Sequence, residues 1–355
     1  MSQRPRILIA RLGAMGDIIH ALPAVLSLHR ALPQCEIGWL VEERWLPLLC
    51  APGTERHGET HPRRPLVEHL HVVDTRGWRK ALAQVRTWRH IIGITRSVRE
   101  LHYDVAIDIQ GAIKSGAMAL LSRAPAIWGF AHPRENAASV FYTRRVDPRA
   151  AHVVDQNLEL ASAVAAAVGG TRDDSAPGFL LPFDPDAERW AREEIDRMHA
   201  DRVAIINPGA GWGAKQWPVE RYSEIARWLT ARGITPLINF GPGEDDLARE
   251  VLYHAPGSQL LQASMSRLIA MTRRAALFVG GDTGPMHLAA ALGVAVVALF
   301  GPTDPARNGP YCQRRAVLRS AQSHTSYSHR NQIDAGLVSI TSAEAIAAGE
   351  KLLES

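Results

Sequence analysis

The sequence predicts an α/β protein with two doubly wound parallel sheets, each covered by helices on both faces. Short, almost continuous apolar runs alternate with helical segments along the chain, a pattern typical of parallel strands buried on both faces. The length of 355 residues exceeds the size at which a single core usually keeps growing. A strip rich in Gly, Ser, Pro and Asp at 169–178 divides the chain into two similar halves. We therefore expect one domain over residues 1–170 and a second over 179–340.

The strands are expected where apolar runs are short and end in glycine, proline or polar residues. In chain order, the expected strands are 7–10, 36–41, 69–73, 105–109, 203–207, 235–240, 275–280 and 294–300. The longer segments between them carry the periodicity and the end signals of helices. The expected helices are 22–32, 85–101, 114–122, 154–168, 186–198, 219–232, 285–292 and 342–353. Asp184 and Asp186 have the spacing of some metal-binding pairs, but they precede a helix and are expected to cap it.

The composition is that of an ordinary globular protein, with 46% hydrophobic and 21% charged residues. No apolar run reaches the roughly 18 residues needed to span a membrane, and the first residues lack a signal-peptide profile. The three cysteines are too widely spaced for a disulfide framework or a Cys-x-x-Cys metal site, and the 15 histidines show no metal-ligand spacing. We expect a protein of the reducing cytoplasm, with no bound metal and no cofactor.

Positive charge gathers in one stretch of the N-terminal half. Ten Lys/Arg stand against four Asp/Glu between Gly53 and Arg99. Arg76, Arg79 and Lys80 begin a series at roughly helical spacing that continues to Arg99. A solvated helix face explains this pattern as well as a surface for an acidic partner does. The acidic partner would be nucleic acid, a phosphorylated lipid headgroup or a phosphorylated sugar acceptor.

Two loops, one in each half, have the features of ligand sites. Asp282, Thr283 and Gly284 lie between an apolar strand and a helix that has Pro285 in its first turn. Helix N–H groups and the positive end of the dipole make such a turn a seat for an anion, although a plain cap at Asp282 is the alternative. Gly16 and Asp17 follow the first strand, where Asp17 is either a helix cap or a positioned carboxylate. Because both loops follow strands, they should line one cleft between the halves.

Other polar residues also follow expected strands. Lys215 lies in a glycine-rich loop and suits a phosphate, although a surface lysine is the alternative. Glu244 follows a strand, where it could bind ribose hydroxyls or simply open a helix. Gln110 and Lys114 are available to polar ligands beyond a strand of the first half. His287 lies behind Asp282 and either faces the anion seat or packs in the core.

These segments together resemble the ADP-heptose:lipopolysaccharide heptosyltransferases of glycosyltransferase family 9, inverting sugar transferases with the GT-B fold. The likeness is carried by Gly-Asp at 16–17, Asp-Ile-Gln-Gly-x-x-Lys-Ser from 108, Lys-Gln-Trp-Pro from 215, Gly-Asp-Thr-Gly-x-x-His from 281 and Gly-Pro-Thr-Asp from 301. It runs from about residue 7 to residue 304, and the blocks look closer to heptosyltransferase I than to heptosyltransferase II. The fold it implies is two Rossmann-like domains that face a central cleft, with the helix at 341–355 packing back toward the N-terminal domain.

The resemblance also implies roles for single residues. Asp17 would be the general base, and Lys215 would neutralise the departing diphosphate. The ADP-heptose donor would be held by Lys215 and seven further residues: Gly16, Glu244 at the ribose, Met265 at adenine, and Asp282, Thr283, Gly284 and His287. The acceptor, the Kdo region of lipid A, would be gripped by Arg76, Arg79, Lys80, Gln110 and Lys114. The family needs no metal, and the enzyme would work peripherally at the inner face of the cytoplasmic membrane.

Parts of the chain depart from the family pattern. The segment 56–65 looks like an inserted loop, and 307–332 shows no family pattern. A family 9 enzyme that glycosylates another acceptor, a protein or a different polysaccharide, is therefore the alternative within enzymes. A binding module for nucleotide sugar or nucleic acid, without transferase activity, is the alternative from another class. Nucleic acid is not expected as a partner.

Overall fold

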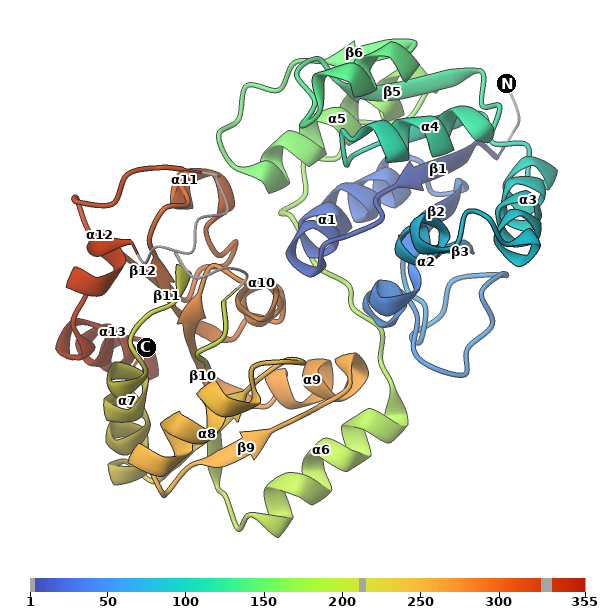
Figure 1. Cartoon of the computed structure of the whole chain (residues 1–355). Coiled ribbons are helices and arrows are strands. Elements are labelled where there is room, and N and C mark those ends of the chain that lie inside the picture. The colour runs from blue at the N-terminus through green and yellow to red at the C-terminus, as the bar shows by residue number, and fades with distance from the viewer. Residues whose placement is uncertain (1–3, 211–214, 327–333, 355) are drawn as a thin grey trace. The chain divides into compact units, whose positions relative to one another are not determined.

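The computed structural model describes residues 4–210, 215–326 and 334–354. The chain forms two compact units, Met1–Phe183 and Asp184–Ser355, and each unit has its own six-stranded sheet (Figure 1). The boundary thus lies just beyond the predicted linker at 169–178. Within the described residues, no helix is both long and apolar enough to cross a bilayer.

The sheet of the first unit is entirely parallel and has the order β3-β2-β1-β4-β5-β6. Its strands are β1 (Arg6–Ala10), β2 (Glu36–Glu42), β3 (His69–Val73), β4 (Val105–Asp108), β5 (Ala126–Phe130) and β6 (Arg144–Val146). Its helices are α1 (Met15–Ala31), η1 (Glu43–Leu48), α2 (Thr75–Lys80), α3 (Val85–Glu100), α4 (Ile113–Leu121), η2 (Asn136–Phe141) and α5 (Val153–Ala167). Helices α1 and α5 pack together, and α3 packs with α4.

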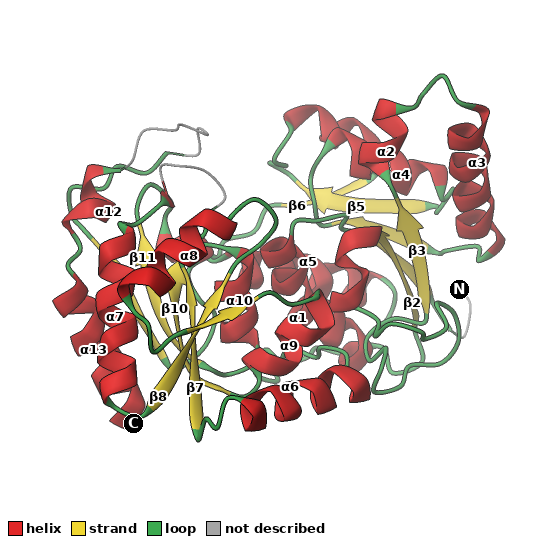
Figure 2. Ribbon diagram, turned by 60° about the horizontal axis from the view of Figure 1, so that its bottom comes forward, coloured by secondary structure: helices red, strands yellow, loops and turns green. Residues whose placement is uncertain are grey.

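The second unit repeats this design. Its parallel sheet has the order β12-β11-β10-β7-β8-β9, which is the strand order of the first sheet when each is numbered from its own first strand. The strands are β7 (Arg202–Asn207), β8 (Ile234–Asn239), β9 (Gln259–Leu261), β10 (Ala275–Gly281), β11 (Ala295–Phe300) and β12 (Arg315–Arg319). The helices are α6 (Pro185–Arg197), α7 (Val219–Ala231), α8 (Asp245–His254), α9 (Met265–Thr272), α10 (Gly284–Ala291), α11 (Pro305–Asn308), α12 (Ala335–Ser339) and α13 (Ser342–Glu354). Figure 2 shows helices on both sides of its strands.

All eight predicted strands are present, and four more were missed. Strands β6, β9 and β12 are edge strands with charged or polar residues and only short apolar stretches, whereas β5, which reads Ala-Ile-Trp-Gly-Phe, is apolar throughout but only partly buried. Helix α1 begins at Met15, not at residue 22, because Pro23 is accommodated inside it. The expected cap at Asp184 is confirmed: its carboxylate accepts from the Asp186 and Ala187 N–H groups at 3.1 and 3.4 Å.

The C-terminal helix corrects one expectation. Helix α13 packs on α7, β11 and β12, so it belongs to the second unit rather than packing toward the N-terminal half. Gly349 lies so close to Trp228 and Leu277 that an added Cβ would be 3.0 and 3.3 Å from their side-chain atoms. The helix therefore completes the covering of the second sheet.

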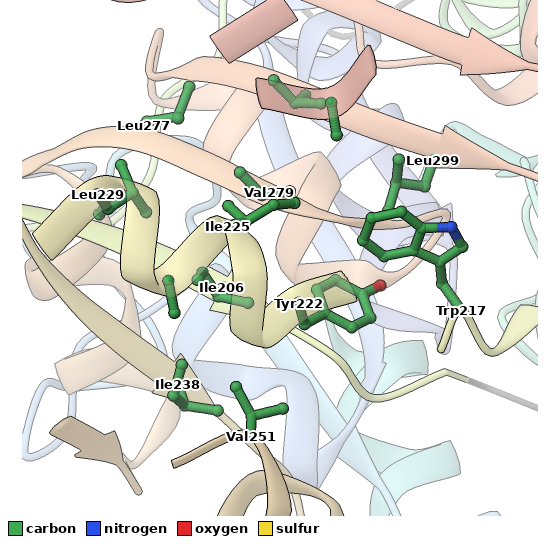
Figure 3. Close-up of a cluster of buried hydrophobic side chains, with 14 of the residues drawn as sticks. Ile206, Trp217, Tyr222, Ile225, Leu229, Ile238, Val251, Leu277, Val279 and Leu299 are labelled. Atoms are coloured by element: carbon green, nitrogen blue, oxygen red, sulfur yellow. The ribbon is translucent and has the colours of Figure 1, made fainter. Parts of the chain in front are cut away.

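The core of the second unit anchors a loop that matters for function. Trp217 is buried and meets Tyr222 edge to face, with ring centroids 4.9 Å apart (Figure 3). Its indole Nε1 donates to the Ile340 carbonyl at 3.0 Å. The chain around Lys215, two residues earlier, is thereby fixed to the segment that leads into α13.

Two other features organise the units. In the loop at 56–65, the buried Arg64 donates to the carbonyls of Glu55 and Glu59 at 3.0 and 2.9 Å, so the loop folds around one guanidinium. In the second unit, Glu188 on α6 is 4% exposed and pairs with Arg273 and Arg274, which follow α9. Of the divergent segment 307–332, residues 327–332 lie outside the described residues.

Candidate active site

Asp17, Gln110, Lys215 and Asp282 follow the strands at which the order of each sheet reverses. In a doubly wound sheet, ligands bind beyond the carboxyl ends of the strands on either side of that point. In the first unit the reversal lies between β1 and β4, which lead to Asp17 and Gln110. In the second unit it lies between β7 and β10, which lead to Lys215 and Asp282. The topology thus places a group of predicted residues at the functional edge of each unit.

Asp17 is held in a fixed position and still reaches solvent. It lies in the first turn of α1, where Oδ2 accepts from the Ala14 N–H at 3.2 Å. The same oxygen pairs with Arg11 Nη2 at 2.7 Å, and the Asp17 side chain remains 38% exposed. Gly16 precedes it in the same turn. The carboxylate can therefore serve both as the helix cap and as a positioned base, so the two sequence interpretations are compatible.

Arg11 was missed in the sequence analysis. It comes directly after β1 and is 7% exposed, and Nη1 also reaches the Ile109 carbonyl at 3.4 Å. Burial lowers the pKa of Arg11, opposed by the negative charges of Asp17 and Asp108. The sequence feature that could have identified it is an arginine directly after the first strand, but only the fold shows that this arginine faces Asp17.

Gln110 ties two strand-end loops together. Its Oε1 accepts from the Leu12 N–H at 2.8 Å, which links the loop after β4 to the loop after β1. The buried Asp108 accepts from the Gln110 and Gly111 N–H groups at 3.0 and 3.1 Å, and from the Tyr142 hydroxyl at 2.7 Å. Burial raises the pKa of Asp108, against these hydrogen bonds. Acceptor binding by Gln110 stays a prediction, and the geometry adds a positioning role.

The predicted basic residues of the first unit lie on α2 and α4. Lys114, in the first turn of α4, is exposed and donates to Thr75 Oγ1 at 3.5 Å, which brings the two helices together. Arg76, Arg79 and Lys80 are exposed on α2. Burial, and then the charge of Arg76, lower the pKa of Arg44. Several positive groups therefore lie within electrostatic range of one another, as a site for an anionic ligand requires.

Lys215, Asp282 and His287 form one cluster in the second unit. Lys215 Nζ lies 2.5 Å from Asp282 Oδ2 and 3.3 Å from the Asp282 carbonyl. His287 Nε2 lies 3.2 Å from Asp282 Oδ1. All three side chains are 10% exposed or less. Burial acts to raise the pKa of Asp282, but His287 and Lys215 outweigh it and hold that pKa well below its usual range.

The start of α10 lies beside this cluster. Thr283 is the N-cap residue, but its side chain makes no capping bond and its Oγ1 donates instead to the Gly281 carbonyl at 3.3 Å. Asp282 does not cap the helix either, because its carboxylate faces Lys215 and His287. The Gly284 end of α10 therefore offers its positive dipole beside a lysine and a histidine, which favours an anion.

Glu244 and Met265 lie further along the same edge, after β8 and β9. Glu244 Oε2 accepts from the Gly241 N–H at 2.8 Å. A Cβ on Gly209 would lie 2.3 Å from its carboxylate oxygens, so the glycine lets the loop after β7 approach Glu244. Met265 is half-buried in the first turn of α9.

The ends of β7 and β8 are joined by two asparagines that the sequence analysis did not single out. Asn239 Nδ2 donates to Asn207 Oδ1 at 2.6 Å, and Asn207 Nδ2 donates to the Gly209 carbonyl at 3.0 Å. The sequence feature that could have identified them is an asparagine as the last residue of each of these two strands. The pair joins the end of β7, and Gly209 just after it, to the end of the strand that leads to Glu244.

No group of three or more His, Cys, Asp or Glu side chains in the described parts of the chain is arranged to hold a metal ion.

Comparison with known proteins supplies the family. Residues 91–336 match glycosyltransferase family 9 (heptosyltransferase). The lipopolysaccharide heptosyltransferase 1 of Pseudomonas aeruginosa is 30% identical over 327 residues, which cover 89% of this chain and 84% of that protein. The enzyme of the same name from Escherichia coli K12 is 28% identical, with 89% and 93% covered.

Solved structures agree in fold. The E. coli heptosyltransferase WaaC, solved with ADP, superposes with a TM-score of 0.78 at 24% identity, covering 98% of this chain and 99% of that one. A family 9 glycosyl transferase from Veillonella parvula gives a TM-score of 0.82 at 22% identity, covering 100% and 99%. The two Rossmann-like units thus form the GT-B fold, and the chain belongs to glycosyltransferase family 9, the family of the lipopolysaccharide heptosyltransferases.

Proposed function

We propose that this glycosyltransferase transfers heptose from ADP-heptose to the Kdo region of lipid A, with inversion at the anomeric carbon and without a metal ion. The names of the relatives support the sugar and the pathway. The observation that supports the mechanism is that each unit holds one part of it. The first unit has a positioned, partly exposed carboxylate, and the second has a lysine–aspartate–histidine cluster beside a helix N-terminus. An inverting transfer needs one base and one stabiliser of the leaving group.

The donor would lie along the carboxyl edge of the second sheet. In the order β9-β8-β7-β10, this edge presents Met265, Glu244, Lys215 and Asp282. Neighbouring strands lie about 4.8 Å apart, so the edge extends for about 14 Å, a length suited to a nucleoside diphosphate. Met265 would contact adenine, Glu244 would accept hydrogen bonds from ribose, and the start of α10 would bind phosphate with Thr283 and Gly284.

The chemical step would begin at Asp17. Its carboxylate would take the proton of an acceptor hydroxyl as that oxygen bonds to the anomeric carbon of heptose. The bond between that carbon and the diphosphate oxygen breaks at the same time, and ADP leaves with the electron pair. Arg11 keeps the base in place, while Lys215 would neutralise the departing charge in a setting where little water dilutes the interaction.

The acceptor would be recognised by charge. Kdo and lipid A carry carboxylates and phosphates, and Arg76, Arg79, Lys80 and Lys114 offer exposed cations on two adjacent helices. We propose that the enzyme works peripherally at the inner face of the cytoplasmic membrane, where such an acceptor would be presented. A family 9 transferase with another acceptor is the second candidate, because the lipopolysaccharide heptosyltransferase 3 of E. coli is also similar, at 23% identity over 95% of both chains.

The deciding experiment measures ADP release from ADP-heptose, with and without Kdo2-lipid A. We expect acceptor-dependent release by the wild type and a loss of at least about 100-fold for Asp17→Asn, which keeps the shape but removes the base. Asp155→Asn is the matched control, because Asp155 also lies in the first turn of a helix of the same unit. Donor binding without release would refute the acceptor, and an unimpaired Asp17→Asn would refute the base. A protein that does not bind ADP-heptose would refute the donor.

A further inference from the structure

The outer side of α3 carries large apolar side chains that are exposed. Val85, Trp88 and Ile92 are 65%, 52% and 62% exposed, and Leu82, just before the helix, is 52% exposed. At 3.6 residues per turn, the three helical residues fall within about 60° of one another, roughly 120° around the helix from the buried Thr87 and Val98. We call these four residues the α3 ridge. A helix of a globular unit usually exposes a polar side, so this apolar ridge requires an explanation.

The largest side chain of the α3 ridge, that of Trp88, is held in place by a hydrogen bond. Trp88 Nε1 donates to the Leu82 carbonyl at 2.8 Å, which fixes the indole against the segment before the helix. This bond satisfies the one polar atom of the ring, so the ring presents an apolar body to its surroundings. Helix α3 lies at the outer edge of the first unit (Figures 1 and 2).

Positive charge surrounds the ridge. From residue 75 to residue 100 the chain carries seven Lys/Arg and a single acidic residue, Glu100. Arg86 and Arg89 are exposed among the ridge residues. At the far end, Ile92, Arg96, Arg99 and neighbouring side chains line an open depression of about 440 Å³. The ridge is thus an apolar stripe inside a strongly basic field.

We propose that the α3 ridge inserts into the interface of an anionic lipid bilayer. An amphipathic helix with tryptophan and aliphatic residues on one side and arginine around them lies in the plane of such a surface, and its apolar side reaches about 5–10 Å into the headgroup region. Juxtaposed arginines add attraction to anionic headgroups. A second copy of the chain fits less well, since a symmetric contact through this ridge would bring the same arginines together.

This inference deepens the proposed function, because a lipid acceptor would lie in the surface on which the ridge docks. It does not depend on the sugar or on the transfer, since binding to a bilayer can be measured without either substrate. None of the ridge residues belongs to the proposed catalytic or binding machinery. Failure of the transfer and failure of the docking can therefore be told apart.

The test is sedimentation with vesicles of phosphatidylglycerol and phosphatidylethanolamine, compared with vesicles of phosphatidylcholine alone. We expect the wild type to bind the anionic vesicles and to lose most of this binding as the salt is raised. The variant V85S/W88S/I92S should bind at least about 10-fold more weakly, and R86E/R89E should bind at least about 25-fold more weakly at low salt. Tyr253→Ser is the matched control, because Tyr253 is 82% exposed in the second unit, and it should bind like the wild type.

Two further measurements support or overturn the inference. The difference in emission between the wild type and Trp88→Phe should shift to shorter wavelength on anionic vesicles, since Trp88 would leave water. The triple variant should retain its rate on a deacylated, soluble acceptor and lose rate on acceptor embedded in vesicles. Equal vesicle binding by the triple variant and the wild type would overturn the proposal. So would a wild type that ignores anionic vesicles, or a dimer in solution that the triple variant abolishes while vesicle binding stays absent.

Discussion

The ion pair between Lys215 and Asp282 allows a quantitative test of the second unit. The two side chains are 10% and 8% exposed, and their charged atoms lie 2.5 Å apart. Removing one partner of a nearly buried pair leaves the other charge without compensation, which costs about 3–5 kcal/mol when burial is complete. His287 still contacts Asp282, so the lower end of this range applies to the loss of the lysine. We expect Lys215→Met to destabilise the second unit by about 3 kcal/mol at pH 7.

A double-mutant cycle separates this pair from its surroundings. Asp282→Asn should cost about as much as Lys215→Met, and the double variant should cost about 4 kcal/mol, about 1 kcal/mol more than either change alone. The coupling free energy should therefore be about 2 kcal/mol. The assay is calorimetric unfolding, read on the transition of the second unit, where a cost of 3 kcal/mol corresponds to a fall in midpoint of about 6–12 °C. Additive effects of the two changes would refute the electrostatic reasoning.

The same pair predicts a dependence on pH. The pKa of Asp282 is lower in the folded protein than in the unfolded chain, whose aspartates titrate near pH 3.9. The folded state therefore binds fewer protons below that pH, and this stabilisation is lost as the pH falls through the folded pKa. We expect the second unit of the wild type to lose stability below about pH 4 more steeply than that of Asp282→Asn. Equal slopes would contradict the assignment.

Three further predictions concern other parts of the chain. Glu188→Gln removes the ion pairs to the two arginines after α9, so it should lower the free energy of unfolding of the second unit by about 3 kcal/mol. Asp186→Asn breaks an exposed ion pair and should change that free energy by less than about 0.5 kcal/mol. Gly209→Ala places a methyl group against Glu244, so it should raise KM for the donor several-fold with kcat and midpoint nearly unchanged; an unchanged KM would argue against a donor role for Glu244. Burial, and then the charges of two neighbouring histidines, lower the pKa of His71 to about 3. The first unit should therefore lose stability as the pH falls from about 6.5 toward 3. His71→Gln should make that loss smaller, as measured by calorimetric unfolding at a series of pH values.

The inner strands could be predicted from the sequence because burial on both faces leaves an almost continuous apolar run. The edge strand β6 reads Arg-Arg-Val and lacks this signal, since its exposed face and edge tolerate charge. The C-terminal helix was predicted at the right place but with the wrong partner, because an amphipathic helix does not specify which surface it covers. The helix covers the second sheet, to which it is adjacent in the chain.

The candidate site was predicted as residues and not as contacts. Asp17, Lys215 and Asp282 were singled out by their place after strands, a local feature. That Asp282 pairs with Lys215, 67 positions away, follows only from the order of β7 and β10 in the sheet. Arg11 escaped notice for the same reason, since one arginine after a strand has no distinctive pattern until the fold sets it against Asp17.

The anchoring of Trp217 has a consequence for how the chain can be shortened. The indole bonds to the Ile340 carbonyl, 123 positions later, and Arg221 also bonds to the carbonyls of Val338 and Ile340. Ending the chain before Val338 would remove both carbonyls and leave Trp217 and Arg221 without these bonds. Such a truncated protein should keep a folded first unit and lose affinity for the donor, so the segment that leads into the last helix acts as a remote brace for a lysine in the middle of the chain.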